Sequence, residues 1–114
     1  MSLEIPEEKH GNTIYSAHGD TVNISGEIYD LDPAEFLKPF LKKIIKNMDK
    51  KIIFNFTELE FINSSTIGCF IYFISERKKN SKVIFQFDNK KPWLQKSFEV
   101  LQSFDEKNIQ FLYI

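Results

Sequence analysis

The sequence is short of cysteine, glycine and proline, and each shortage excludes a class of protein. Its one cysteine, Cys69, cannot form a disulfide within the chain or a thiolate cluster, and such sparse use is typical of a reducing, cytoplasmic setting. Four glycines and four prolines among 114 residues exclude collagen-like and linker-like chains. The composition, 42% hydrophobic and 27% charged, predicts one globular domain over residues 1–114. Twelve phenylalanines predict a core filled by rings.

Long hydrophobic runs and a secretory leader are also missing. The longest apolar run, residues 67–74, contains Gly68 and is far shorter than the ~20 residues of a membrane-spanning helix. The first residues are polar and acidic, so we expect no signal peptide and a loosely ordered segment over residues 1–11. The sequence therefore predicts a soluble, cytoplasmic protein that does not associate with membranes.

Groups that carry out catalysis or hold metals are scarce. His10 and His18 have no nearby cysteine or Gly-x-Ser-x-Gly partner, and we interpret both as exposed turn residues. Two histidines and a remote cysteine do not give the spacing of a metal site. No glycine-rich loop that cradles phosphates is present in the sequence. We therefore expect a protein that is not an enzyme, with no catalytic residues, metal or cofactor.

Charge is distributed unevenly, although the net charge is −1. Residues 1–35 carry eight acids against one base, whereas residues 36–96 carry thirteen bases against five acids. A basic region suggests binding to nucleic acid. The favoured interpretation is that these lysines form the solvated faces of helices, and nucleic-acid binding is kept as the less favoured alternative.

Apolar periodicity predicts an α/β domain in which helices pack against a mixed, mainly parallel sheet, in the order ββαβαβαβ. Strands 51–56 and 83–87 are apolar at nearly every position, which is typical of strands covered on both faces. Asp32 and Pro33 are typical of a helix start, and Pro39 either kinks that helix or delays its beginning. The other expected strands are 12–17, 21–29 and 109–114. The expected helices are 33–48 with Asp32 as its N-cap, 64–80 and one opened by Pro92.

The segment 64–80 has the propensity of a strand but the length of a helix. Because two strands flank it at the distance of a βαβ unit, we predict a buried helix that begins at Ser64-Ser65-Thr66. Cys69 is expected to be a small buried hydrophobe in it. In the next helix, Trp93 is expected in the core beside apolar residues that include Phe98, Leu101 and Phe104.

The segment Phe61-Ile62-Asn63-Ser64-Ser65-Thr66-Ile67-Gly68 resembles the Asp-Ser-Ser-Gly-Leu-Gly segment of STAS domains, the anti-sigma-factor antagonist family. Downstream, Pro92-Trp93-Leu94-Gln95-Lys96-Ser97 is similar to a segment of a bacterial STAS-like regulator subfamily that also carries an Asn-Ser-Ser core. The similarity covers residues 21 to 114. Asn63 stands where the family usually has Asp, and Thr66 stands where it usually has Gly.

The resemblance implies a single STAS-like domain that takes part in partner switching. It implies that a histidine-kinase-like serine kinase, or anti-sigma factor, binds the unmodified protein and phosphorylates Ser64, with Ser65 and Thr66 as reserve acceptors. A PP2C-type phosphatase would reverse the modification. Partner contacts are expected at Asn63, Ser64, Ser65 and Thr66, and at Glu58 and Glu60 on the rim.

Two further interpretations of these residues stay open. Asn63 and the residues after it are also the types that cap helices, so their role can be structural alone. The same fold can also serve as a constitutive interaction or scaffold module without a phosphoswitch. In each case we expect a monomer or a weak homodimer.

Overall fold

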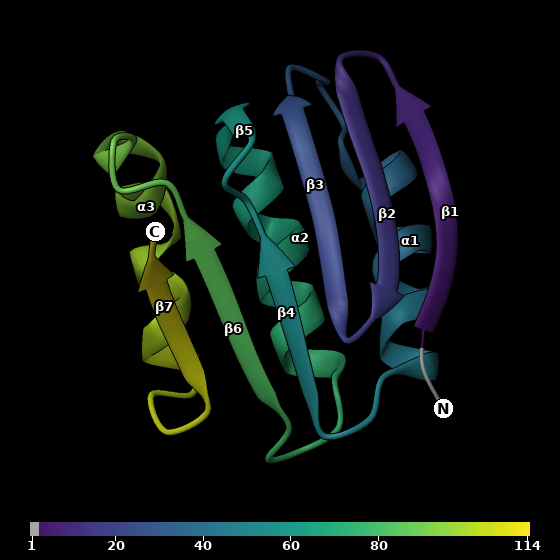
Figure 1. The fold of residues 1–114 in the computed structure, drawn as a ribbon, viewed down its shortest axis with the longest axis vertical. Coiled ribbons are helices and arrows are strands. Elements are labelled where there is room, and N and C mark those ends of the chain that lie inside the picture. The colour runs from purple at the N-terminus through teal and green to yellow at the C-terminus, as the bar shows by residue number, and fades with distance from the viewer. Residues whose placement is uncertain (1–2) are drawn as a thin grey trace.

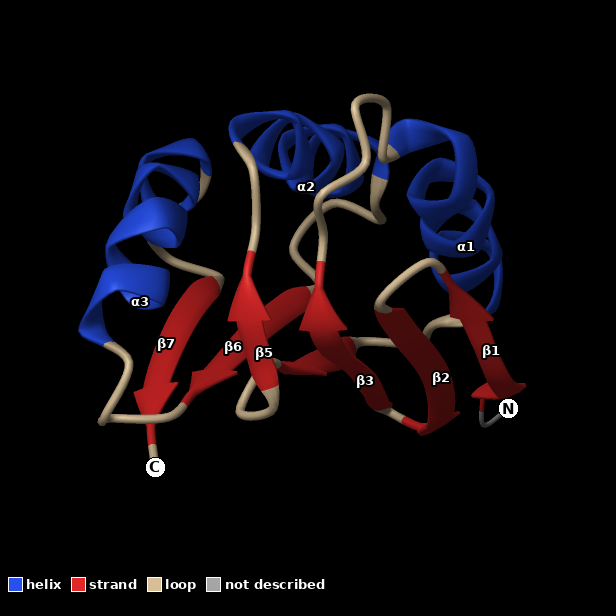
Figure 2. Cartoon of the chain, turned by 90° about the horizontal axis from the view of Figure 1, so that it is seen from above, coloured by secondary structure: helices blue, strands red, loops and turns tan. Residues whose placement is uncertain are grey.

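Three helices cover one face of a seven-stranded sheet and leave its other face without a helix (Figures 1 and 2). The computed structural model describes residues 3–114. Neighbouring strands run antiparallel from β1 to β3 and parallel from β3 to β7. The predicted α/β class, with a mixed and mainly parallel sheet, is therefore confirmed.

The elements follow one another along the chain much as the periodicity predicts. The sheet order is β1-β2-β3-β4-β6-β7, and the short strand β5 pairs with the end of β3. Residues 64–76 are helical. This confirms the helix that was predicted from the length of the segment and against its strand propensity. The elements are β1 (Leu3–His10), β2 (Thr13–Gly19), β3 (Thr21–Glu27), α1 (Ala34–Asn47), β4 (Lys51–Asn55), β5 (Leu59–Phe61), α2 (Ser64–Glu76), β6 (Lys82–Phe87), α3 (Pro92–Phe98), the 3-10 helix η1 (Glu99–Phe104) and β7 (Ile109–Tyr113).

Two strands are absent from the predicted order. The segment expected to be loosely ordered instead forms β1 from residue 3 onward, antiparallel to β2, and residues 1 and 2 lie outside the described part. Leu3 and Ile5 are buried while the acidic residues between and after them are exposed, so the strand signal consisted of only two apolar positions. β5 has three residues, too few for a periodic signal.

The prediction that β4 and β6 are covered on both faces is wrong. Ile53 and Ile84 are neighbours on the face without helices, and both are only partly buried. From β3 to β7 each parallel strand is added on the same side of the preceding one. Right-handed crossovers that all step in one direction place every connecting helix on the same face. An apolar run therefore does not by itself show that a strand is buried on both faces of the sheet.

The core between sheet and helices is filled by phenylalanine rings, as the composition predicts. Phe56, directly after β4, lies 4.8 Å from Phe98 of α3 and 5.4 Å from Phe70 of α2, measured between ring centroids. Phe54 and Phe85 stack between neighbouring strands at 5.4 Å. All five rings are fully buried. Contacts between these rings thus join β4, β6, α2 and α3.

Trp93 and Phe104 do not belong to this core, contrary to the prediction. Trp93 is 57% exposed, whereas Leu94 and Phe98, one helical turn apart, point inward. Regular α-helix ends at Phe98 and continues as the 3-10 helix η1, so the α-helical period does not extend to Phe104. The single-residue offset of Trp93 from Leu94 rotates its side chain out of the apolar stripe.

Helix α1 begins at Ala34, and Pro33 rather than Asp32 occupies the capping position. Pro39 therefore does not delay the helix, and its side chain lies on the exposed side. Within residues 3–114, no helix combines the length and the apolar character that a membrane crossing requires.

Candidate functional site

The three helices begin at the edge of the sheet where the parallel strands end (Figure 1). In α/β sheets this carboxyl edge is where binding sites commonly form, because loops and helix N-termini gather there. Ser64 and Ser65 open α2 at this edge, and both are exposed. The two serines thus lie on an accessible surface, as the sequence predicts.

Asn63 caps α2 and leaves both serine hydroxyls without a capping role. Its backbone is extended, and its side-chain Oδ1 accepts hydrogen bonds from the Thr66 N–H at 3.1 Å and from the Thr66 hydroxyl at 3.0 Å. Neither serine hydroxyl makes a hydrogen bond to any group within residues 3–114. The capping interpretation is therefore confirmed for Asn63 alone.

The prediction that Thr66 is a reserve acceptor and a partner contact is wrong. Its side chain has no exposed surface, and its hydroxyl donates to Asn63. Residue 66 is the third residue of α2 and lies on the side of the helix that faces the core. A kinase could reach it only after the first turn of the helix opened.

The amide of Asn63 also fixes the loop between β3 and α1. Its Nδ2 donates to the backbone carbonyl of Asp30 at 2.6 Å. The carboxylate of Asp30 in turn bonds His10 Nε2 at 3.0 Å, and the His10 ring stacks on Phe36 at 4.3 Å. His10 is thus a partly buried structural residue and not an exposed turn residue. His18 is exposed as predicted, but it lies in β2 and not in a turn. An Asp at position 63 could not donate the bond to Asp30.

Apolar side chains are exposed around this linkage, and the sequence analysis missed them. Leu31, directly after Asp30, is 99% exposed. Tyr29 and Phe61 are also largely exposed, and their rings stack at 4.8 Å. Because the Asn63–Asp30 bond joins the two loops, this apolar rim (Tyr29, Leu31 and Phe61) lies beside the start of α2. A leucine between two acids ahead of Pro33 was the available signal.

The two rim glutamates, Glu58 and Glu60, differ in their surroundings. Glu60 forms an ion pair with Lys91 at 2.8 Å, and Lys91 also donates to the Thr57 and Leu59 carbonyls. Glu58 lines a hollow of about 480 Å³ over the ends of β4 and β6, and neither serine lines that hollow. Neither glutamate side chain bonds to Ser64 or Ser65 within residues 3–114, and their role as partner contacts stays a prediction.

Two further observations concern the cysteine and the metal-binding residue types. Cys69 is buried, as predicted, and this burial raises the pKa of its thiol, which disfavours the thiolate. No group of three or more His, Cys, Asp or Glu side chains within residues 3–114 is placed to hold a metal ion.

Replacing Asn63 with Asp should loosen the β3–α1 loop. The change sets a carboxylate oxygen against the Asp30 carbonyl oxygen and removes the donor, which costs about 1–3 kcal/mol. A carboxylate at a helix start recovers about 0.3–1 kcal/mol of this. We expect a net loss of about 1 kcal/mol in urea unfolding and faster amide exchange over residues 28–33. The exposed Asn89→Asp serves as control, and unchanged exchange in Asn63→Asp would contradict the role given to this bond.

Comparisons of this chain with protein-family models and with curated proteins find no match. The STAS-like resemblance therefore depends on the residues quoted above.

Proposed function

We propose that this protein is a cytoplasmic bacterial regulator of the partner-switching type, similar to anti-sigma-factor antagonists, that acts by binding and not by catalysis. A histidine-kinase-like serine kinase or anti-sigma protein would bind it when Ser64 is unmodified. The observation that carries the proposal is the exposed, unbonded Ser64 hydroxyl at the start of α2, within an Asn-Ser-Ser segment that resembles the STAS phosphosite.

The start of α2 can accommodate a phosphate without rearranging the domain. Asn63 accepts a hydrogen bond from the Thr66 N–H. The N–H groups of Ser64 and Ser65 lie in the first turn, where the helix has no earlier carbonyl to accept their hydrogen bonds. The positive end of the helix dipole further favours an anion there. No acidic residue occupies the first turn, so no carboxylate of the helix itself opposes the charge.

The apolar rim explains why a phosphate would release a partner. Tyr29, Leu31 and Phe61 offer apolar contact area, and exposed apolar side chains that lie together mark interaction surfaces. Phosphorylation adds about −1.5 to −2 charges at the adjoining helix start. A partner packed on the rim would then face a hydrated charge, and a loss of about 3 kcal/mol corresponds to more than a hundredfold in affinity.

Ser64 is the expected acceptor, and Ser65 is the reserve. Incubation with ATP and a serine kinase encoded beside this gene should place phosphate on Ser64, as mapped by mass spectrometry. Ser64→Ala should abolish the modification, while Ser97→Ala, an exposed serine of α3, should not change it. A PP2C-type phosphatase should remove the phosphate. The modified protein should bind its partner at least about a hundredfold more weakly.

Phosphate confined to sites other than residues 64 and 65, or its absence with every such kinase, would contradict the proposal. A partner that binds the modified and unmodified forms equally would instead support a constitutive scaffold. That second candidate is favoured by one observation, the exposure of the Leu31 side chain, which could anchor a partner without any modification of the protein. Leu31→Ala should weaken binding in both cases.

A further inference from the structure

The amino edge of the sheet, opposite the serines, contains a lysine-lined hollow. It has a volume of about 580 Å³ and lies between the loop that follows α1 and the loop that follows α2. Five of its eight lining residues are lysines and one is an acid. The lining residues are Asp49, Lys50, Lys51, Lys78, Lys79, Asn80, Ser81 and Lys82.

Positive charge in this hollow is largely uncompensated. Lys51 lies 3.4 Å from the carboxylate of Asp20. The other four lysines have no carboxylate within ion-pair distance among residues 3–114. The ends of α1 and α2 contribute about half a negative charge each, which is less than the excess of lysines. Like charges gathered around one concavity repel one another, so an anion bound there would be stabilised.

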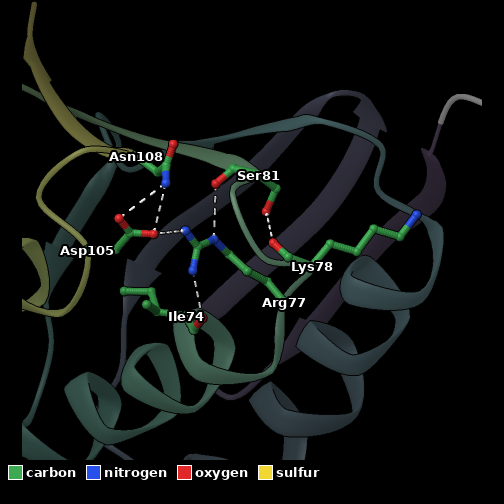
Figure 3. Close-up of polar contacts among 6 residues, drawn as sticks. All are labelled: Ile74, Arg77, Lys78, Ser81, Asp105 and Asn108. Atoms are coloured by element: carbon green, nitrogen blue, oxygen red, sulfur yellow. Dashed lines mark hydrogen bonds and ion pairs between the residues drawn. The ribbon is translucent and has the colours of Figure 1, made fainter.

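A buried arginine fixes the turn that carries three of these lysines (Figure 3). Only 5% of the Arg77 side chain is exposed, and its guanidinium donates to the carbonyls of Ile74 at 2.8 Å and Ser81 at 3.2 Å and to the Asp105 carboxylate at 2.5 Å. The Ser81 hydroxyl closes the turn by donating to the Lys78 carbonyl at 2.7 Å. The turn is therefore shaped before any ligand arrives.

Asn80, at the tip of this turn, has a positive φ of 69°. A residue other than glycine adopts this conformation at an energetic cost, which the surrounding hydrogen bonds must offset. Lys79 and Lys82 flank this tip and are exposed, so their charges are free to meet a ligand. A preorganised turn loses less conformational entropy on binding than a mobile loop does.

We propose that the amino-edge hollow binds a chain of phosphate groups, such as an inorganic oligophosphate or the triphosphate of a nucleotide. The lysines are point charges suited to phosphate oxygens, and several are needed because a single phosphate would leave most of them unpaired. No aromatic ring lines the hollow, so it offers no platform on which bases stack. Its volume is that of a small-ligand site and not of a groove that follows a nucleic-acid strand.

Inorganic tripolyphosphate, titrated calorimetrically at low salt, tests this inference. The wild-type protein should bind it, and ATP should bind with similar affinity because the base adds no contact. Lys79→Gln/Lys82→Gln should weaken binding at least about tenfold, whereas Lys42→Gln/Lys96→Gln, which removes the same charge from exposed helix faces, should change it less than about twofold. Added salt should weaken binding in every case.

Equal weakening by the two double variants would overturn the proposal, because it would indicate diffuse attraction and no site. Tighter binding of single-stranded DNA than of tripolyphosphate would overturn it in favour of a nucleic-acid surface. Absence of tripolyphosphate binding at low salt would also overturn it. Amide chemical-shift changes should map to residues 49–51 and 78–82 and not to Ser64, which keeps this result independent of the proposed function.

Discussion

Replacing Phe56 with alanine should lower the free energy of unfolding by about 4 kcal/mol. Phe56 is fully buried directly after β4, and its ring has five aromatic neighbours. Removing it opens a cavity that rings held by separate elements cannot close by a local shift. Its neighbours, with ring centroids 4.8 to 5.8 Å away, are Phe54, Phe70, Phe85, Phe87 and Phe98.

Urea unfolding followed by circular dichroism measures this effect. Phe104→Ala is the matched control, because it deletes the same ring from η1, where the side chain is mostly exposed. We expect this control to lose less than about 1 kcal/mol. A loss of similar size in both variants, or a loss below about 1 kcal/mol for Phe56→Ala, would show that β4, β6 and the helices do not share one rigid core.

Replacing Arg77 with methionine should cost about 3 kcal/mol of stability. Methionine keeps most of the apolar stem but donates no hydrogen bond. The carbonyls of Ile74 and Ser81 would each lose a charged donor in a place that water reaches poorly. The turn over residues 78–82 should exchange its amides faster, and tripolyphosphate binding should weaken as well.

The contribution of Arg77 to the free energy of unfolding should decrease as the pH falls. The hydrogen bond from Arg77 to Asp105 holds the pKa of that carboxyl below its ordinary value of 3.8, helped by Asn108. A lowered pKa in the folded state means that the stabilisation is present above pH 3.8 and is lost as the pH falls through the lower, folded-state pKa. The stability difference between wild type and Arg77→Met should therefore shrink from pH ~7 to pH ~2. A difference that grows in acid would contradict this origin.

The start of α2 illustrates what could be predicted from local sequence and what could not. Residues Asn63 to Thr66 are good helix-capping types, so a helix start at this point followed from the residues alone. Which of them capped, and which stayed free, depended on the neighbouring loop, because the Asp30 carbonyl requires a donor and selects the amide of Asn63. Thr66 was buried by the core beneath it, which no local pattern reports.

The lysines likewise show what the sequence could predict and what depended on the fold. Their number was plain in the sequence, and their interpretation as solvated helix faces described residues such as Lys42 on α1. Lys50 and Lys79 lie in separate loops after separate helices, and only the adjacency of β4 and β6 brings these loops together. Arg77, which shapes the second loop, gave no signal in the sequence because its partners include backbone carbonyls and the distant Asp105.

By itself the sequence determined the types and order of most elements and the aromatic core. These follow from composition and from periods of two and 3.6 residues, which are properties of neighbours along the chain. Only the tertiary structure decided that one face of the sheet is open, that β1 is a strand, that Trp93 and Leu31 are exposed and that the lysines share a hollow. Such features depend on which strands pair and on the handedness of their connections, so they belong to contacts between residues far apart in sequence.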